Sequence, residues 1–469
     1  LGGGGLSCVV GELALDAGFG AKVNLEKVHL KLKNMAPWEI WVSESQERMM
    51  FTVKPRDVQA VLDRCSAWDV EAVAIGEVIK EKRNIVRFND TEILNLDLEF
   101  TTGGPVYNRP YILPEIDNLD AAQLPKLPSD LSKIIEEIIC NPEVASKDWV
   151  IRQYDHEVRG ATAIKPIQGK IGQEVHGDSS VLKPVENSWK GLALTADINP
   201  HLMEANPYHG TMSAVEEICR NLASVGARID SLADCLCFGN PQRPEIMGQF
   251  KSSCDALRDA ATSVDVPYVS GNVSLYNETA DGAIPPTPVL MGIGLVDDIR
   301  NCVTSDMKDK GTIWLIGENK QQMGASLYYR TLGINCSNVP TTDFDSFIPR
   351  MEQLIDAIEC GEVVACHDIS TGGIALATIE MCMSGVGAKI NLSGEMRSDL
   401  ELFNESNGRW LVQVKPGQER EFSKRFDFAK KIGTVHENIE FVLNDKKSLN
   451  FSIEKLRKIW TEPLWNRLA

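Results

Sequence analysis

Apolar residues recur with helical spacing at several points along the chain. Near its start they stand at positions 6, 9, 10, 13 and 14, and the same period of about 3.6 residues returns over residues 131–139. A third amphipathic pattern predicts a helix through Phe250, Cys254, Leu257 and Ala261. These three segments predict helices that each turn one apolar face toward a core.

Other elements are indicated by short apolar runs and by one capping signal. We expect strands at 49–53, 73–78, 191–196 and 266–269, the third leading to Asp197 and the last ended by Gly271. Ser213 followed by Glu216 fits a capping box, which predicts a helix starting there with apolar positions 215, 218, 222 and 225.

The pattern of the first hundred residues returns near the end of the chain. GFGAKVNL at 18–25 recurs as GVGAKINL at 385–392, and ESQER at 44–48 recurs as ESNGR at 405–409. The blocks keep their order, and their separation is far longer than the roughly 20–50 residues of a solenoid unit. The sequence therefore predicts a duplicated domain.

The repeat divides the chain into four parts. The first copy covers 1–104, a proline-rich linker 105–130, a different domain 131–305 and the second copy 306–469. If the duplicated domain is called B and the other A, the order is B′, linker, A, B. The simplest domain order from which this one could derive is A-B-A-B, so we expect a further A domain before Leu1.

Composition narrows the classes of protein that fit. The net charge of −18 argues against a nucleic-acid binder, whose surface must be basic. No apolar run approaches the roughly 20 residues of a membrane span. The twelve cysteines form no CxxC pair, which disfavours a disulfide framework or zinc site and favours reduced thiols in a cytoplasmic protein.

Two polar segments of the A domain could carry chemistry. Residues 234–241 place Asp234 before a Gly-Asn-Pro turn, whose free backbone N–H groups suit phosphate, although a plain turn fits equally. In 269–278, Gly271 allows close approach of a ligand, Asn272 offers an oxygen to Mg²⁺ and Ser274 a hydroxyl to phosphate. A polar turn remains the alternative there.

Two further segments are more ambiguous. The loop at 44–48 shares Glu, Ser and Arg with its second copy, but only the first copy has Gln46 and Glu47. This pattern indicates one working and one degenerate copy, or else a shared structural turn. The cluster Tyr154-Asp155-His156 suits a nucleotide site or acid–base work, or a surface cluster without function.

Taken together, the motifs resemble phosphoribosylformylglycinamidine synthase of the small PurL type. The blocks that carry the resemblance are 43–48, 145–150, 152–156, 234–241 and 269–278. The resemblance implies an α/β (α+β) protein with the duplicated A/B architecture of the PurM/PurL superfamily, present here as B′-linker-A-B. Each A domain would then form half of a barrel-like pair.

The resemblance also implies a reaction. ATP would phosphorylate the amide oxygen of formylglycinamide ribonucleotide with Mg²⁺ as cofactor, and ammonia would displace phosphate to give the amidine. The implied partners are a glutaminase subunit, a small assembly subunit and the missing N-terminal half, which would carry the catalytic residues. Another ATP-dependent enzyme of the superfamily, or an inactive nucleotide-holding scaffold, stays open.

Roles for single residues follow from the resemblance alone. It assigns the ribonucleotide to Glu44, Ser45, Gln46 and Ser274, ATP to Asp234 and Gly271, and Mg²⁺ to Asn272. It also implies an auxiliary nucleotide site, for which the candidates are Asp155, Asp178, Asp197 and Asp368. Two positions depart from the family pattern: Cys237 replaces an expected Asn, and Thr371 replaces an Asp near the auxiliary site.

Overall fold

The computed structural model describes residues 1, 3–104, 106–115, 124–392, 394–426 and 428–468. It divides into two compact units, Leu1–Asn108 and Arg109–Ala469. Positions 105 and 116–123 of the expected linker lie outside the described residues, and its remaining residues carry neither helix nor strand.

The first unit packs helices on a four-stranded sheet of order β2-β1-β3-β4. Helix α1 contributes Leu6, Val10 and Ala14 to its core, which confirms the helix expected from the spacing at the start of the chain. The elements are α1 (Gly5–Asp16), β1 (Gly20–Asn24), α2 (Pro37–Val42), α3 (Val58–Ser66), β2 (Gly76–Ile79), β3 (Arg83–Phe88), β4 (Thr91–Asp97) and α4 (Leu98–Gly103).

Two strand expectations in this unit fail wholly or in part. Residues 49–53 form no strand, and of 73–78 only the end enters β2. The second copy gives the physical reason. There the equivalent segment, β18 (Trp410–Val414), is hydrogen-bonded on both sides, to β15 (Thr312–Ile316) and to β16 (Val363–Asp368). No described strand flanks residues 49–53 in this way.

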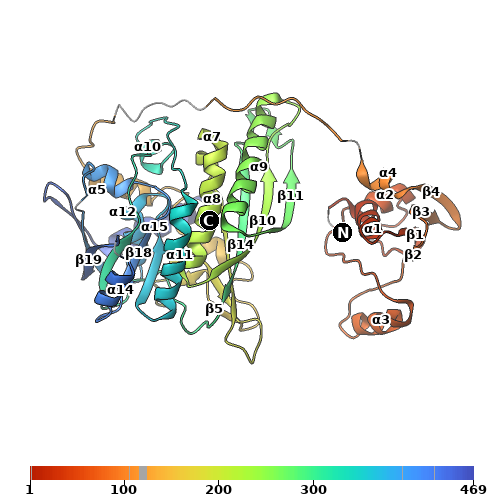
Figure 1. Ribbon diagram of the computed structural model, residues 1–469, viewed down its shortest axis with the longest axis horizontal. Helices are drawn as coiled ribbons and strands as arrows, with labels where there is room; N and C mark the ends of the chain where they lie inside the picture. The colour runs from red at the N-terminus through yellow and green to blue at the C-terminus, as the bar shows by residue number, and fades with distance from the viewer. Residues whose placement is uncertain (2, 105, 116–123, 393, 427, 469) are drawn as a thin grey trace. The chain divides into compact units, whose positions relative to one another are not determined.

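The second unit begins with a six-stranded sheet of order β11-β10-β14-β9-β8-β5. Long helices α8 and α9 pack against each other beside it (Figure 1). The elements of this part are α5 (Leu131–Ile139), α6 (Asp148–Ile151), β5 (Thr162–Ile164), β6 (Ile167–Gln168), β7 (Val175–His176), β8 (Ser180–Leu182), β9 (Gly191–Asp197), α7 (Pro200–Ala205), α8 (Pro207–Ser224), β10 (Arg228–Cys237), α9 (Pro244–Val264), β11 (Tyr268–Ser274), β12 (Glu278–Thr279), β13 (Gly282–Ala283) and β14 (Thr287–Val296).

Most elements expected here are confirmed, and two boundaries are wrong. α5, α9 and β9 form where the patterns indicated. Helix α8 does not start at Ser213: Asn206 caps it by accepting the His209 N–H, and Ser213 lies inside it, donating to His209 O. Gly271 does not end its strand, because β11 pairs in parallel with β10 through Ser274.

A seven-stranded sheet of order β16-β18-β15-β19-β17-β20-β21 completes the second unit. Its strands β17, β19, β20 and β21 repeat the pairing of β1, β2, β3 and β4 in the first unit, one parallel and two antiparallel pairs. The remaining elements are α10 (Leu327–Thr331), α11 (Phe344–Glu359), α12 (Gly373–Cys382), β17 (Gly387–Asn391), α13 (Ser398–Phe403), α14 (Glu419–Arg425), β19 (Lys430–His436), β20 (Ile439–Val442), β21 (Ser448–Phe451) and α15 (Ile453–Leu468).

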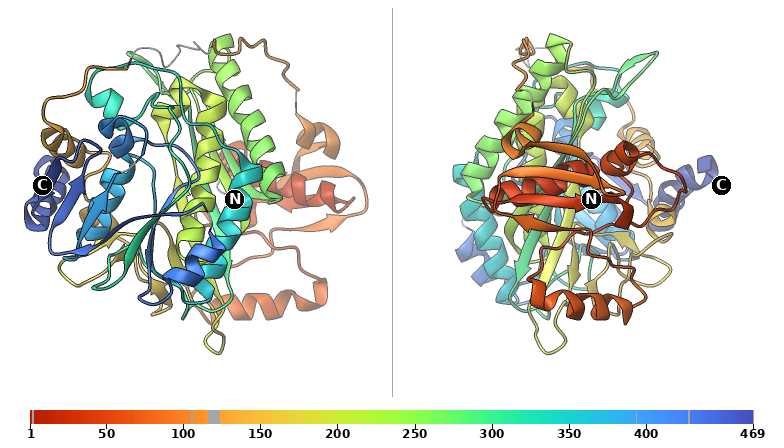
Figure 2. Two further views of the ribbon diagram at one scale, coloured as in Figure 1. Left: turned by 60° about the vertical axis from the view of Figure 1, so that its left-hand side comes forward. Right: turned by 90° about the vertical axis from the view of Figure 1, so that its right-hand side faces the viewer.

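Helix α8 joins the two sheets of the second unit. It contacts β9, β10 and β14 of one sheet and β16 of the other, and α11 packs on it and on α9 (Figure 2). Of its residues 207–224, fifteen are buried, including Glu216 and Arg220, so the helix carries charged groups into the core. Among the described residues, no helix combines the length and apolarity needed to cross a membrane.

Candidate functional site

Asp234 and Gly271, the residues expected at the ATP site, lie opposite each other on adjacent strands. The parallel register of β10 and β11 pairs them directly. A Cβ atom at position 271 would stand 3.0 Å from Asp234 Oδ2, so glycine keeps the space beside the carboxylate open. Burial raises the pKa of Asp234. The carboxylate lies on β10, ahead of the Gly-Asn-Pro segment at 239–241.

Asn272 and Ser274 lie on the other face of the same strand. Side chains alternate along a strand, and the register places Asn272 beside Cys235 and Ser274 beside Cys237. The amide Nδ2 of Asn272 donates to Cys235 Sγ at 3.4 Å, which leaves its carbonyl oxygen as the atom available to a cation. The structure therefore places the expected ATP and Mg²⁺ residues on neighbouring positions but on opposite faces.

The loop of Glu44, Ser45 and Gln46 is held by its first and last residues. Glu44 Oε1 accepts the Gly4 N–H at 2.9 Å. Arg48 donates to Ser45 O at 2.9 Å and to Ser43 O at 2.6 Å. Ser45 and Gln46 themselves are exposed. The loop thus has a fixed backbone with two polar side chains at the surface.

The second copy repeats this construction and then buries it. Glu405 accepts the Gly372 N–H at 2.8 Å, and Arg409 donates to Ser406 O at 2.8 Å. Here the loop closes on α8: Asn407 Nδ2 donates to Ser213 Oγ at 2.8 Å and the Gly408 N–H to Glu216 Oε1 at 3.0 Å. The same loop is therefore free on its polar side in one copy and docked in the other.

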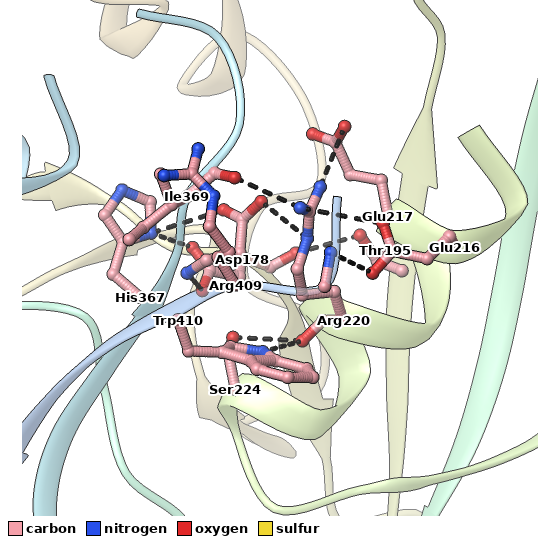
Figure 3. A network of polar contacts seen from close by, with 12 residues as sticks. Asp178, Thr195, Glu216, Glu217, Arg220, Ser224, His367, Ile369, Arg409 and Trp410 are labelled. Atoms are coloured by element: carbon pink, nitrogen blue, oxygen red, sulfur yellow. Dashed lines mark hydrogen bonds and ion pairs between the residues drawn. The ribbon is translucent and has the colours of Figure 1, made fainter. Parts of the chain in front are cut away.

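Three of the four auxiliary-site candidates belong to one buried polar cluster around α8 and β16. Within it, His367 Nδ1 lies 2.6 Å from Asp178 Oδ1 (Figure 3). The Asp368 N–H donates to Asp178 Oδ2 at 3.1 Å. One possible ligand atom each from Asp178, His367 and Asp368 lies within 4.8 Å of the other two. Burial lowers the pKa of His367, but the pairing with Asp178 outweighs it and raises that pKa well above its ordinary value.

Arg220 of α8 supplies the positive charge at the centre of the cluster. Its guanidinium lies 3.6 Å from Glu216 Oε2 and 3.2 Å from Glu217 Oε2 (Figure 3). Asp368 Oδ2 lies 3.3 Å from the same group. Burial raises the pKa of the third candidate, Asp197, to about 7, against the opposing effect of Arg220. Arg220 thus pairs with acids of the protein itself, in a cluster whose carboxyl groups outnumber its cations.

The fourth candidate, Asp155, does not join the cluster. It is exposed, with a φ of 39°, and among the described residues no hydrogen bond or ion pair links it to the cluster. The residues that sequence reasoning missed are Arg220, His367 and Arg409. Arg220 follows Glu216 by one helical turn and His367 precedes Asp368, but neither spacing indicates a buried network by itself.

Known domains match most of the chain. A family model for AIR synthase related protein, C-terminal domain, matches residues 1–89 and 319–446, and one for the N-terminal domain matches 176–296. The PurL subunit of phosphoribosylformylglycinamidine synthase from Thermoplasma acidophilum is 37% identical over 426 residues, 90% of this chain. The same subunit from Thermococcus sibiricus is 38% identical over 468 residues, 98% of this chain. The chain belongs to the PurL family.

Solved PurL structures share the fold. Thermotoga maritima PurL in complex with ATP superposes with a TM-score of 0.64 at 21% identity, over 93% of this chain and 63% of that chain. The complex of the same protein with FGAR gives a TM-score of 0.62 at 21% identity, over 93% of this chain and 61% of that chain. The chain spans 56% of the Thermoplasma PurL subunit and 63% of the Thermococcus one.

Proposed function

We propose that the protein to which this chain belongs is an ATP-dependent ligase that converts formylglycinamide ribonucleotide into formylglycinamidine ribonucleotide in purine biosynthesis. The observation that carries the proposal is the 37% identity to a PurL subunit over 90% of the chain. Thermotoga maritima PurL, at lower identity, has been solved in complex with ATP and in complex with FGAR.

The proposed reaction is a phosphoryl transfer followed by an amidation. The γ-phosphoryl group of ATP passes to the amide oxygen, which leaves ADP and an iminophosphate. Ammonia then adds to the same carbon and inorganic phosphate departs. Since positioning and charge stabilisation dominate such transfers, the protein must hold the two substrates in line.

In this proposal the two exposed polar groups of the first loop hold the ribonucleotide. Ser45 and Gln46 offer a hydroxyl and an amide, and Glu44 fixes the backbone beneath them through Gly4. Ser274 is the fourth substrate residue. Asp234 and Gly271 line the nucleotide, with the glycine leaving the carboxylate accessible.

The proposed site offers one protein oxygen to Mg²⁺. Asn272 has one carbonyl oxygen not used by its bond to Cys235. One protein oxygen is compatible with Mg²⁺, which keeps several waters and takes phosphate oxygens from its substrate. When bound, the ion would neutralise the developing charge on the phosphates.

We assign turnover to these residues and not to the cluster around Arg220. A nucleotide there would compete with Asp368, Glu216 and Glu217 for the same guanidinium. The proposed partners are a glutaminase that supplies ammonia and a small assembly subunit. The structure of PurLQS from Thermotoga maritima, whose PurL chain shares this fold, supports that arrangement.

The test is an assay of the whole protein with formylglycinamide ribonucleotide, ATP, Mg²⁺ and ammonium. We expect release of ADP and phosphate that depends on both the ribonucleotide and ammonium, together with the amidine product by mass spectrometry. Transfer of phosphate to a stable product without ammonium would identify a kinase of the same superfamily. Nucleotide binding without turnover would identify a scaffold, and either result overturns the proposal.

A further inference from the structure

Two cysteines of β10 lie side by side on the face of the sheet that also carries Asn272. Cys235 and Cys237 are two positions apart, and because side chains alternate along a strand they share one face. Their sulfur atoms are 3.7 Å apart, and both thiols are free and partly exposed. The chain has no CxxC pair, the usual sign of a zinc site, but the extended strand also brings two thiols together here.

The separation of the two sulfur atoms fits a bridging metal ion better than a disulfide bond. In a disulfide the sulfur atoms are about 2.05 Å apart, and two Cα atoms at about 6.6 Å, the span of two strand residues, stand near the upper limit for one. A tetrahedral zinc ion with Zn–S bonds of about 2.3 Å holds two thiolate sulfur atoms about 3.8 Å apart. The observed 3.7 Å therefore matches zinc coordination with little movement of either side chain.

Polar groups of the adjacent strand β11 stand beside both sulfur atoms. The Asn272 Nδ2 group donates to Cys235 Sγ at 3.4 Å. Burial raises the pKa of the Cys237 thiol, and a hydrogen bond with Ser274, its partner in the register, acts against burial. Outer contacts of this kind orient metal ligands and stabilise the charge of a thiolate. The pair thus has the surroundings of a metal site.

We propose that Cys235 and Cys237 bind a thiophilic divalent cation of the zinc class, with water in the remaining coordination positions. Thiolate ligands select such ions, whereas Mg²⁺ prefers oxygen. Each thiol gives its proton to solvent when the ion binds, so that two metal–sulfur bonds replace two S–H bonds. The site consists of different residues from the buried cluster around Arg220.

The thiol pair is joined to the proposed Mg²⁺ position through Asn272. The amide nitrogen of Asn272 faces Cys235, and its carbonyl oxygen is the atom assigned to Mg²⁺. A zinc ion on the thiols would therefore place a second positive charge beside that oxygen and lower the affinity for Mg²⁺. This consequence for turnover rests on the proposed function, whereas binding of the ion to the thiols does not.

The first test measures binding of Cd²⁺ and Zn²⁺ to the whole protein, without substrates and with a thiol-free reductant. Bound Cd²⁺ gives an ultraviolet charge-transfer band with thiolate, and Zn²⁺ should remove that band by competition. We expect Cys237→Asn to weaken Cd²⁺ binding about a hundredfold or more, because a lost ligand costs more than a lost outer contact. Cys360→Ser is the control, since Cys360 is an exposed thiol outside the pair, and it should leave the band unchanged.

Protection from alkylation tests where the ion binds. Trypsin cleaves after Arg228 and Lys251, and the intervening Arg243 is protected by the proline that follows it. The resulting peptide carries both cysteines of the pair and no other cysteine. Zn²⁺ should slow the reaction of this peptide's thiols with a maleimide in the folded protein, and should leave Cys360 reacting at its original rate.

The proposal is overturned if no cadmium–thiolate band appears, if Cys237→Asn keeps the band, or if Zn²⁺ slows alkylation of the pair and of Cys360 alike. Asn272→Ala should weaken Cd²⁺ binding about tenfold, as loss of an outer contact does. None of these measurements requires turnover, so they are independent of the proposed function. In the amidation assay, Zn²⁺ should inhibit the parent protein and spare Cys237→Asn.

Discussion

The carboxylate of Glu405 accepts the backbone N–H of Gly372 at 2.8 Å, at the turn where α12 begins. It also accepts the Leu327 N–H at 3.0 Å. Glu405 is buried, and it ties the start of one helix to the start of another.

The turn next to this contact should not tolerate a side chain. Gly373 has a φ of +65°, and a Cβ there would stand 2.6 Å from Asn404 O and 2.7 Å from Leu402 O. We expect Gly373→Ala to lower the free energy of unfolding by at least about 3 kcal/mol. Gly361→Ala is the control, because Gly361 has a φ of +71° but open space around it. It should lose only about 1 kcal/mol in denaturant titration. Equal losses would contradict the clash.

Glu405→Gln should change how stability depends on pH. Burial raises the pKa of Glu405 to about 7, so the folded protein holds a proton that the unfolded chain releases near pH 4.5. Stability of the parent therefore falls as pH rises from 4.5 to 7, by about 3 kcal/mol in total. The amide variant should lack this slope in urea titrations. Glu44→Gln, at the exposed equivalent contact, should keep it, and an unchanged slope in Glu405→Gln would contradict the prediction.

The contribution of His176 to stability should change with pH in the opposite sense to that of Glu405. Because burial lowers its pKa to about 4, the unfolded chain takes up a proton below pH 6.5 that the folded protein does not. This contribution to stability is complete above pH 6.5 and is lost as pH falls toward 4, by about 3 kcal/mol. His176→Asn should flatten the pH dependence in this window, measured by thermal unfolding. His436→Asn, at an exposed position, should not.

Asp234→Asn should remove turnover without unfolding the protein. The side chain is half-buried and makes no hydrogen bond or ion pair among the described residues, so we expect the fold not to depend on its charge. We expect kcat to fall by about a hundredfold or more, as when one electrostatic group of an active site is lost. Asp230→Asn, on the same strand but exposed, should keep full activity. An active Asp234→Asn variant would exclude Asp234 from the nucleotide site.

Substitution of Ser45 should affect substrate binding, whereas substitution of its equivalent Ser406 should affect stability. Ser45 is exposed, whereas the buried Ser406 Oγ accepts the Lys320 N–H at 2.9 Å. Ser45→Ala should raise the KM for the ribonucleotide about tenfold and leave unfolding unchanged. Ser406→Ala should lower the free energy of unfolding by about 1–3 kcal/mol and leave KM unchanged. A Ser45→Ala variant with normal KM would remove this residue from the substrate site.

Local pattern predicts local structure well in this chain. The isoleucines of α5 are spaced for burial, and the helix forms over the expected residues. Helix α8 shows where pattern fails. Asn206 and Pro207 form a stronger start signal than Ser213, a cap followed by proline at the first helical position. Ser213 and Glu216 have the spacing of a capping box, but their polar groups instead bind the loop at 405–409.

The candidate site is only partly accessible to sequence reasoning. The register that pairs Asp234 with Gly271 depends on two strands joined through α9, and neither strand's own pattern specifies it. Asp178 and Asp368 meet across 190 residues. Resemblance to a family named these aspartates, but it did not indicate that Arg220 lies among them. Long-range charge pairing of this kind has no periodic signature along a chain.

The loop that recurs at 44–48 and 405–409 gives this molecule an internal reference. One fold presents the same Glu-Ser-x-x-Arg backbone twice, once with its polar side toward solvent and once pressed against α8. A substitution made in both copies therefore reports two quantities from a single polypeptide. The difference between them isolates what the loop contributes to a ligand from what it contributes to its own folding.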